Sequence, residues 1–193
     1  ATGGPRGGPT RAEIHGSFKA IVDSPVWRLA HALASLVTPD GNTITIPNYY
    51  DAVRPPTDEE QRLINGVLAK WNEAGLRRLL GVERFIDGWT GLDALLAYLY
   101  HPTLNIDGIW GGYTGEGSKT ILPHKATAKV DSRLPPNLHP EQALAMLRSH
   151  LDARGFTDIV IRQRGGYPPS QTSVEAPPVR AAISVFNKYG RTP

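Results

Sequence analysis

The sequence contains no cysteine, which excludes disulfide frameworks, thiolate metal sites and cysteine nucleophiles. It also lacks any apolar run near the ~20 residues that a membrane-spanning helix needs. No G-x-S-x-G turn occurs, so the sequence gives no support to a serine hydrolase. The missing apolar run leads us to expect no membrane contact. We also expect a cytoplasmic protein, although the lack of cysteine excludes only a disulfide-stapled secreted scaffold.

Charge of one sign is not concentrated anywhere in the chain. The 21 Lys and Arg residues are scattered among 18 Asp and Glu residues, and no basic block accompanies an aromatic platform. We therefore expect no nucleic-acid partner. With 193 residues, 40% of them hydrophobic, the chain is long and apolar enough to form one large globular domain.

Helical and strand patterns alternate along the chain. Apolar residues at helical spacing predict helices over residues 25–38, 57–79, 92–99, 140–153 and 177–189. Alternating patterns predict strands over residues 43–46, 102–109, 120–133 and 158–162. The sequence therefore predicts an α+β fold, a two-layer sandwich in which an antiparallel sheet carries two helices on one face. A helical insertion interrupts it at about residues 48–101.

Two groups of side chains could suggest a metal site. His150 and Asp152 form an H-x-D pattern, but they lie in a predicted helix, where such positions point about 200° apart. Glu59 and Glu60 could bridge metals as a carboxylate pair, but Thr57 and Glu60 form the simpler pattern of a helix capping box. A zinc site needs at least three converging ligands, so we predict no metal site in this chain.

A glycine-rich segment resembles a phosphate-binding loop, with the sequence Gly112-Tyr113-Thr114-Gly115-Glu116-Gly117-Ser118-Lys119-Thr120. A predicted strand follows it, where phosphate binding requires the N-terminus of a helix. We therefore interpret it as a loop that joins two strands. Basic residues follow along the next strand, at Lys119, Lys125, Lys129 and Arg133. They are either a solvated face or hold an anion, for which the planar arginine fork is best suited.

Several phrases, in order, resemble the lid domain of the M20 metallopeptidase family. The downstream phrases are Pro102-Thr103-Leu104-Asn105-Ile106-Asp107-Gly108, Gly112-Tyr113-Thr114-Gly115, Lys119-Thr120-Ile121-Leu122-Pro123, Ala128-Lys129 and Arg133-Leu134-Pro135. Upstream, the histidine motif of the family resembles the phrase Gly8-Pro9-Thr10-Arg11-Ala12-Glu13-Ile14-His15-Gly16-Ser17. The resemblance extends over about residues 8–172. The helical insertion makes the chain similar to the dipeptidase- and deacetylase-like branch of the family.

This resemblance implies a domain organisation. Residues 1–172 would form the ferredoxin-like lid or dimerisation domain, with its helical insertion at about residues 48–101. Residues 173–193 would be the first helix of the returning catalytic domain. The catalytic domain itself would lie outside the chain, so the chain alone would be an inactive fragment.

The resemblance also implies a function. Such enzymes are zinc-dependent peptidases or amidohydrolases whose metals polarise the carbonyl of a small peptide or N-acyl amino acid and activate water. The zinc ligands would not be in this chain. His15 would act as a catalytic residue that stabilises the oxyanion in the active site of the partner subunit of a homodimer. Thr120 would contact substrate, and Arg133 would bind its carboxylate.

Two other interpretations stay open on sequence grounds. The chain could be a free-standing dimerisation or small-ligand-binding module without a catalytic parent. It could also bind a nucleotide through the glycine-rich loop.

Overall fold

The computed structural model describes residues 1–191. Its α-helices are α1 (Pro25–Ala34), α2 (Asp58–Leu68), α3 (Glu73–Leu80), α4 (Gly91–Tyr100), α5 (Pro140–Ala153) and α6 (Pro177–Lys188). Three 3-10 helices are η1 (Gly4–Arg6), η2 (Gly16–Ala20) and η3 (Ile86–Gly88). The α5 bounds agree with the helix that the sequence predicts over residues 140–153.

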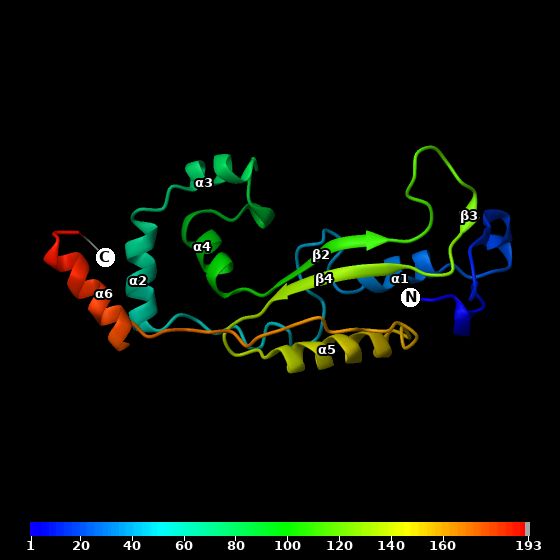
Figure 1. Ribbon diagram of the computed structural model, residues 1–193. Helices are drawn as coiled ribbons and strands as arrows, with labels where there is room; N and C mark the ends of the chain where they lie inside the picture. Colours follow the sequence, from blue (N-terminus) through cyan, green and yellow to red (C-terminus); the bar gives the residue numbers. More distant parts are fainter. Residues whose placement is uncertain (192–193) are drawn as a thin grey trace.

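The described strands form two antiparallel pairs. β1 (Ile14–His15) pairs with β3 (Ile121–Leu122), and β2 (Thr103–Trp110) pairs with β4 (Thr127–Arg133). In Figure 1 the β2–β4 ribbon occupies the middle of an elongated molecule, and the β1–β3 pair lies near one end. The α+β class is therefore confirmed, with a sheet divided into two short pieces.

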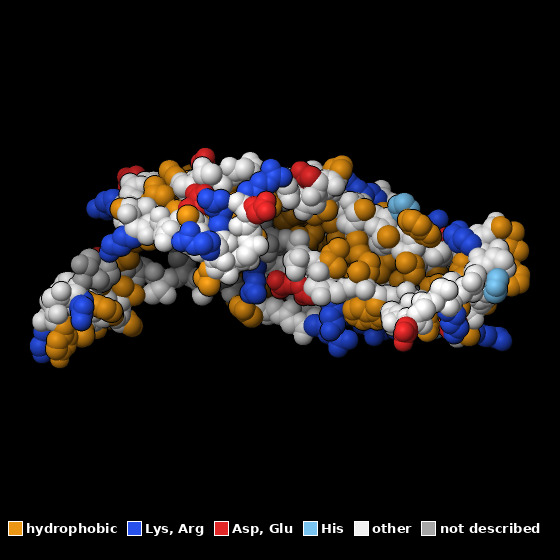
Figure 2. Space-filling model, turned by 90° about the horizontal axis from the view of Figure 1, so that it is seen from above, with side chains coloured by type: hydrophobic (Ala, Val, Ile, Leu, Met, Phe, Trp, Pro, Cys, Tyr) orange, Lys and Arg blue, Asp and Glu red, His pale blue; other side chains and the backbone are white. Residues whose placement is uncertain are grey.

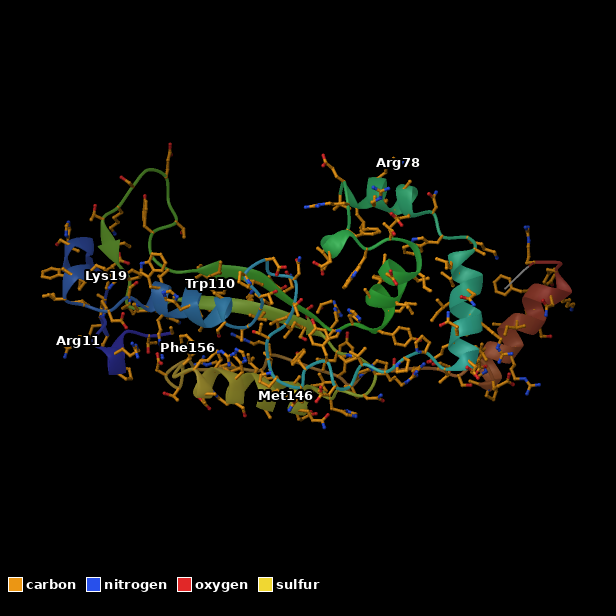
Figure 3. The ribbon with its side chains drawn as sticks, turned by 180° about the vertical axis from the view of Figure 1, so that it is seen from behind. Arg11, Lys19, Arg78, Trp110, Met146 and Phe156 are labelled. Carbon is orange, nitrogen blue, oxygen red and sulfur yellow. The ribbon has the colours of Figure 1, made fainter. Side chains whose placement is uncertain are left out.

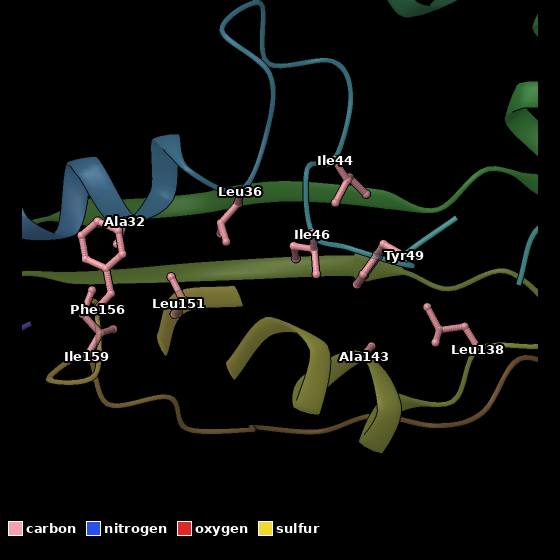
Figure 4. Close-up of a cluster of buried hydrophobic side chains, with 10 residues drawn as sticks. All are labelled: Ala32, Leu36, Ile44, Ile46, Tyr49, Leu138, Ala143, Leu151, Phe156 and Ile159. Carbon is pink, nitrogen blue, oxygen red and sulfur yellow. The ribbon is translucent and has the colours of Figure 1, made fainter. Parts of the chain in front are cut away.

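The main core lies between α1, α5 and the segment that follows α1 (Figure 4). Its buried members are Ala32, Leu36, Ile44, Ile46, Tyr49, Leu138, Ala143, Leu151, Phe156 and Ile159. Leu104 of β2 packs against this cluster, and the Tyr49 hydroxyl lies 2.7 Å from the Ser132 hydroxyl of β4. These contacts fix the β2–β4 ribbon on the two helices.

The predicted strand at residues 43–46 is wrong. The segment turns back on the chain just after α1, where the Thr45 amide donates to the Leu36 carbonyl and Ile44 forms an isolated bridge with Val37. The Ile44 amide donates to the Tyr50 hydroxyl instead of to a strand. Ile44 and Ile46 are still buried, so the alternating pattern reports burial and not strand pairing.

The predicted strand at residues 158–162 is also wrong. Ile159 is buried and Val160 is exposed, as in a strand. However, Arg148 of α5 donates one hydrogen bond to the Ile159 carbonyl, at 2.7 Å, and another to the Phe156 carbonyl, at 2.9 Å. A side chain thus satisfies backbone groups that a neighbouring strand would otherwise bind.

Residues 48–101 form the predicted helical segment, with α2, α3 and α4. The capping box predicted at its start is confirmed, because the Thr57 hydroxyl accepts from the Glu60 amide and the Glu60 carboxylate accepts from the Thr57 amide. Arg54 binds the same carboxylate through two hydrogen bonds of 2.6 and 2.7 Å. This explains Glu60 without a metal, since its role is to begin a helix.

The last helix, α6, begins at Pro177, where the sequence predicts a helix over residues 177–189. In Figure 1 it lies beside α2, at the opposite end of the molecule from β3. None of its residues is buried, and Val185 and Phe186 are about half exposed. None of the helices within residues 1–191 has the length and apolar character required to cross a membrane.

Candidate functional site

His15 and Thr120 are brought together by the β1–β3 pair. Ile14 pairs with Leu122 and His15 pairs with Ile121, so Thr120 directly precedes the partner of His15. The Gly16 amide extends the pairing by donating to the Thr120 carbonyl at 3.1 Å. The close approach at this point favours glycine, because a Cβ on Gly16 would lie 3.1 Å from Cγ2 of Thr120.

The His15 side chain is exposed and is held through one ring nitrogen. Its Nδ1 lies 3.2 Å from the backbone nitrogen of Ser17 and 2.7 Å from the Ser17 hydroxyl. These contacts cap η2, which starts at Gly16. Ser17 belongs to the histidine motif seen in the sequence, and a polar side chain at the start of a short helical turn is a local signal for such a cap.

His15 and Thr120 line a shallow depression of about 650 Å³, together with Glu13, Ile14, Ser118, Lys119 and Ile121. On its rim, the Lys119 ammonium lies 3.0 Å from a Glu13 carboxylate oxygen, and both side chains are about half exposed. Arg11 and Lys19 lie at the same end of the molecule (Figure 3). The depression can therefore admit a polar or anionic group from outside.

The basic residues predicted along one strand have separate partners. Lys119 pairs with Glu13, and the Lys129 ammonium lies 5.9 Å from the centre of the Trp110 ring. Arg133 is the last residue of β4, and its guanidinium lies 3.4 Å from the Asp131 carboxylate. The Arg133 side chain remains 71% exposed, so it can still receive a carboxylate from solution.

Arg133 does not share a site with His15 and Thr120. β4 begins at Thr127 and ends at Arg133, and its six steps alone cover roughly 20 Å. In Figure 1 the arrowhead of β4 points away from β3 toward the helical segment. The three residues singled out from the sequence therefore occupy two places on the domain.

No three His, Asp or Glu side chains within residues 1–191 converge in a way that could hold a metal ion. His150 is buried in α5, where its Nε2 donates to the Ser35 carbonyl at 2.7 Å and its Nδ1 accepts from Arg154. Burial lowers the pKa of the His150 imidazole. His150 is thus a neutral core histidine, and the described residues do not fit a zinc site.

The glycine-rich loop between β2 and β3 is closed by its own side chain, since the Tyr113 hydroxyl donates to the Glu116 carbonyl at 2.8 Å. The short strand β3 follows the loop along the chain, where a phosphate-binding loop would continue into a helix. The geometry therefore favours the interpretation of this loop as a strand connection.

Comparison with known proteins agrees with the resemblance seen in the sequence. Residues 10–158 match the model of the M20 peptidase dimerisation domain, which is more than half of the chain. The β-Ala-His dipeptidase of Rattus norvegicus is 32% identical over 139 residues, which cover 72% of this chain and 27% of that protein. The Cys-Gly metallodipeptidase dug1 of Schizosaccharomyces pombe is 30% identical over 146 residues, which cover 75% and 29%.

Solved structures give the same result. An M20 family metallo-carboxypeptidase from Sulfolobus solfataricus superposes with a TM-score of 0.77 at 34% identity, covering 94% of this chain and 41% of that chain. Human carnosine dipeptidase 1 superposes with a TM-score of 0.73 at 27% identity, covering 94% and 39%. The chain spans less than a third of the curated relatives that it matches. It belongs to the family of M20 peptidase dimerisation domains.

Proposed function

We propose that this chain is the lid and dimerisation domain of a zinc-dependent peptidase or amidohydrolase that acts on small peptides or N-acyl amino acids. The names of its relatives support a hydrolase, because they include dipeptidases and a metallo-carboxypeptidase. The matched segment is only 27% of the rat dipeptidase, which leaves room for a separate metal-binding domain. The zinc ligands would belong to that domain, and this chain alone would not hydrolyse substrate.

The observation that carries the proposal is the position of His15. The exposed His15 imidazole accepts a hydrogen bond from the Ser17 backbone N–H through Nδ1, which leaves Nε2 available to a ligand in the depression shared with Thr120. Such a group can donate a hydrogen bond to the oxyanion of a tetrahedral intermediate. Thr120 would contact the same substrate through its hydroxyl group.

His15 would serve the active site of the partner subunit. Exposed apolar side chains accompany it, since Phe18 is 49% exposed and Ile21 is 83% exposed. A docking surface needs such side chains, whereas a solvated surface does not. A homodimer in which this end of one lid meets the catalytic domain of the other copy would cover them.

The face of the β2–β4 ribbon would contribute to the same dimer. Figure 2 shows hydrophobic side chains gathered over the middle of one face. Ile106, Ile109, Trp110 and Val130, all on these two strands, are each between 39% and 53% exposed. Apolar residues grouped in this way are typical of a surface that another protein covers.

Arg133 would serve a different active site from His15, namely the site of its own subunit. Its separation from His15 supports this assignment, because one small substrate does not extend over roughly 20 Å of strand. The guanidinium would bind the substrate carboxylate through two parallel hydrogen bonds. Asp131 would hold the side chain in place until substrate arrives.

The test uses the polypeptide in which this domain is joined to its metal-binding domain. Loss of an oxyanion donor lowers kcat by roughly 100- to 1,000-fold, and we expect this for His15→Ala. His31→Ala is the matched control, since His31 is an exposed histidine on α1. Equal activity of the two variants would contradict the proposal.

Arg133→Lys provides a second test. Lysine keeps the charge but loses the planar fork, so we expect KM for a substrate with a free carboxylate to rise while kcat changes less. Arg164→Lys is the control, because Arg164 is an exposed arginine in the extended linker. An unchanged KM for Arg133→Lys would remove Arg133 from the substrate site.

A further inference from the structure

The backbone N–H and the hydroxyl of Ser17 both contact His15, but they differ in which protonation states of the ring they allow. A hydroxyl can donate or accept, and its 2.7 Å distance to Nδ1 does not say which nitrogen of the ring carries the proton. A backbone N–H can only donate, and that of Ser17 points at the same Nδ1 from 3.2 Å. Both contacts are satisfied together only if Nδ1 carries no proton.

We propose that Ser17 is a positioning residue that holds His15 as the neutral tautomer with its proton on Nε2. The backbone N–H and the hydroxyl of Ser17 both donate to Nδ1, so the ring has its remaining proton on the outward nitrogen. His15 then offers a hydrogen-bond donor without carrying a positive charge. The use of that donor in catalysis rests on the proposed function, whereas the tautomer itself does not.

The local backbone prepares this arrangement. Gly16 lies against Thr120 and places Ser17 at the start of η2, where amides have no partner within the helix. The amides of Ile21 and Val22 both donate to the Phe18 carbonyl, which closes the turn at its other end. The imidazole is therefore fixed by a turn that is itself fixed to β3.

The geometry also leaves Nε2 accessible. His15 is exposed, and among residues 1–191 no hydrogen bond engages its Nε2. The neighbouring ion pair of Glu13 and Lys119 supplies one charge of each sign on the rim of the depression. A donor held in this way is ready for an oxygen atom that carries developing negative charge.

The direct test is nuclear magnetic resonance on the ¹⁵N-labelled chain at alkaline pH, where imidazoles are neutral. Long-range ¹H–¹⁵N spectra distinguish the two tautomers, and His15→Gln identifies the signals of His15. We expect the Nε2–H form to predominate in the wild type. Ser17→Ala should raise the population of the Nδ1–H form severalfold, and Ser17→Thr should restore the wild-type ratio.

The signals of His31 serve as the internal control and should not change in any of these variants. A wild-type ring that is mainly protonated on Nδ1 would overturn the proposal. So would a tautomer ratio that Ser17→Ala leaves unchanged.

A kinetic measurement on the complete polypeptide separates this inference from the proposed function. Ser17→Ala removes one of the two hydrogen bonds, so kcat should fall roughly three- to tenfold with KM nearly unchanged. A tautomer shift without any fall in kcat would leave Ser17 as the residue that sets the tautomer but would overturn its role in catalysis. An inactive His15→Ala with no tautomer effect of Ser17→Ala would overturn the positioning role alone.

Discussion

The region of α1 and α5 packs more tightly than α3 in the helical segment of residues 48–101. α1 and α5 each bury three residues, and Ala32, Ala143 and Leu151 among them form one cluster with buried residues of the segment 44–49. In the helical segment α3 buries none, and Leu79 is 82% exposed. The region of α1 and α5 is stabilised by a shared core, whereas α3 of the helical segment leaves apolar side chains exposed to solvent.

The same contrast applies to the site. His15 lies in a short β-pair held by backbone hydrogen bonds and by the cap from Ser17. Arg133 lies at the end of β4 that leads toward α5, with one ion pair to Asp131. A donor held by hydrogen bonds at one end and an exposed cation at the other suit the contacts with two different active sites that we propose.

Leu151→Ala should have the largest effect on stability. Leu151 is 4% exposed in the main core, and loss of such a side chain costs about 2–5 kcal/mol in the free energy of unfolding. Leu79→Ala, in the helical segment, should cost about 0.5 kcal/mol or less. Denaturant unfolding measures the free energy of unfolding of both variants. Equal losses would contradict the contrast between the α1–α5 core and the helical segment.

Arg28→Met should have the next largest effect, about 1–3 kcal/mol, because it leaves the carboxylate of Asp158 without its charged partner. Arg28 binds both Asp158 oxygens, at 3.1 and 3.3 Å from Nε, and its guanidinium carbon lies 4.3 Å from the centre of the Phe156 ring. Figure 3 shows Phe156 between α1 and α5. Arg164→Met is the control and should unfold like the wild type.

The effect of Arg28→Met should also depend on pH. Hydrogen bonds from Arg28 lower the pKa of Asp158, although burial opposes them. The stabilisation is therefore complete above the ordinary aspartate pKa of about 3.9 and is lost as pH falls through the lower value of the folded state. The difference between wild type and variant, measured by denaturant unfolding, should shrink below about pH 4. A constant difference would mean that Arg28 acts mainly through the Phe156 ring.

Thr57→Ala should have a smaller effect than Arg28→Met, and a local one. It removes the hydroxyl that accepts from the Glu60 amide, which costs about 1 kcal/mol at a helix N-cap. Hydrogen exchange should accelerate for the amides of α2 and stay unchanged for those of α5. Thr114→Ala, in the exposed glycine-rich loop, is the control. Faster exchange in both α2 and α5 would show that the helical segment and the α1–α5 core unfold together.

Local rules predicted the helices well. Pro140 at the first position and a leucine at every third or fourth residue gave the bounds of α5, and the pattern at Thr57 and Glu60 gave the start of α2. These signals lie within a few residues of the structure that they specify. The β2 strand was predicted for the same reason, because its alternation extends over eight residues, whereas the single strand predicted over residues 120–133 is divided into β3 and β4.

The strand predictions failed where side chains take the hydrogen bonds of the backbone. The hydroxyl of Tyr50 and the guanidinium of Arg148 take backbone groups that an alternating sequence assigns to a strand partner. The site shows a similar limit. His15 was found through its resemblance to a family motif, but its contact with Ser17 depends on a turn geometry that the sequence does not specify.

The most direct test of the central claim mixes two inactive variants of the complete polypeptide, His15→Ala and Arg133→Met. If His15 acts in the partner's site and Arg133 in its own, each mixed dimer contains one site with both residues intact. Random exchange of subunits in a twofold dimer should then restore roughly a quarter of the wild-type activity. The control is a double variant that carries both substitutions in every subunit, so that no dimer contains a site with both residues intact. Mixed dimers that form, as shown by a tag on one subunit, and yet remain inactive would contradict the account.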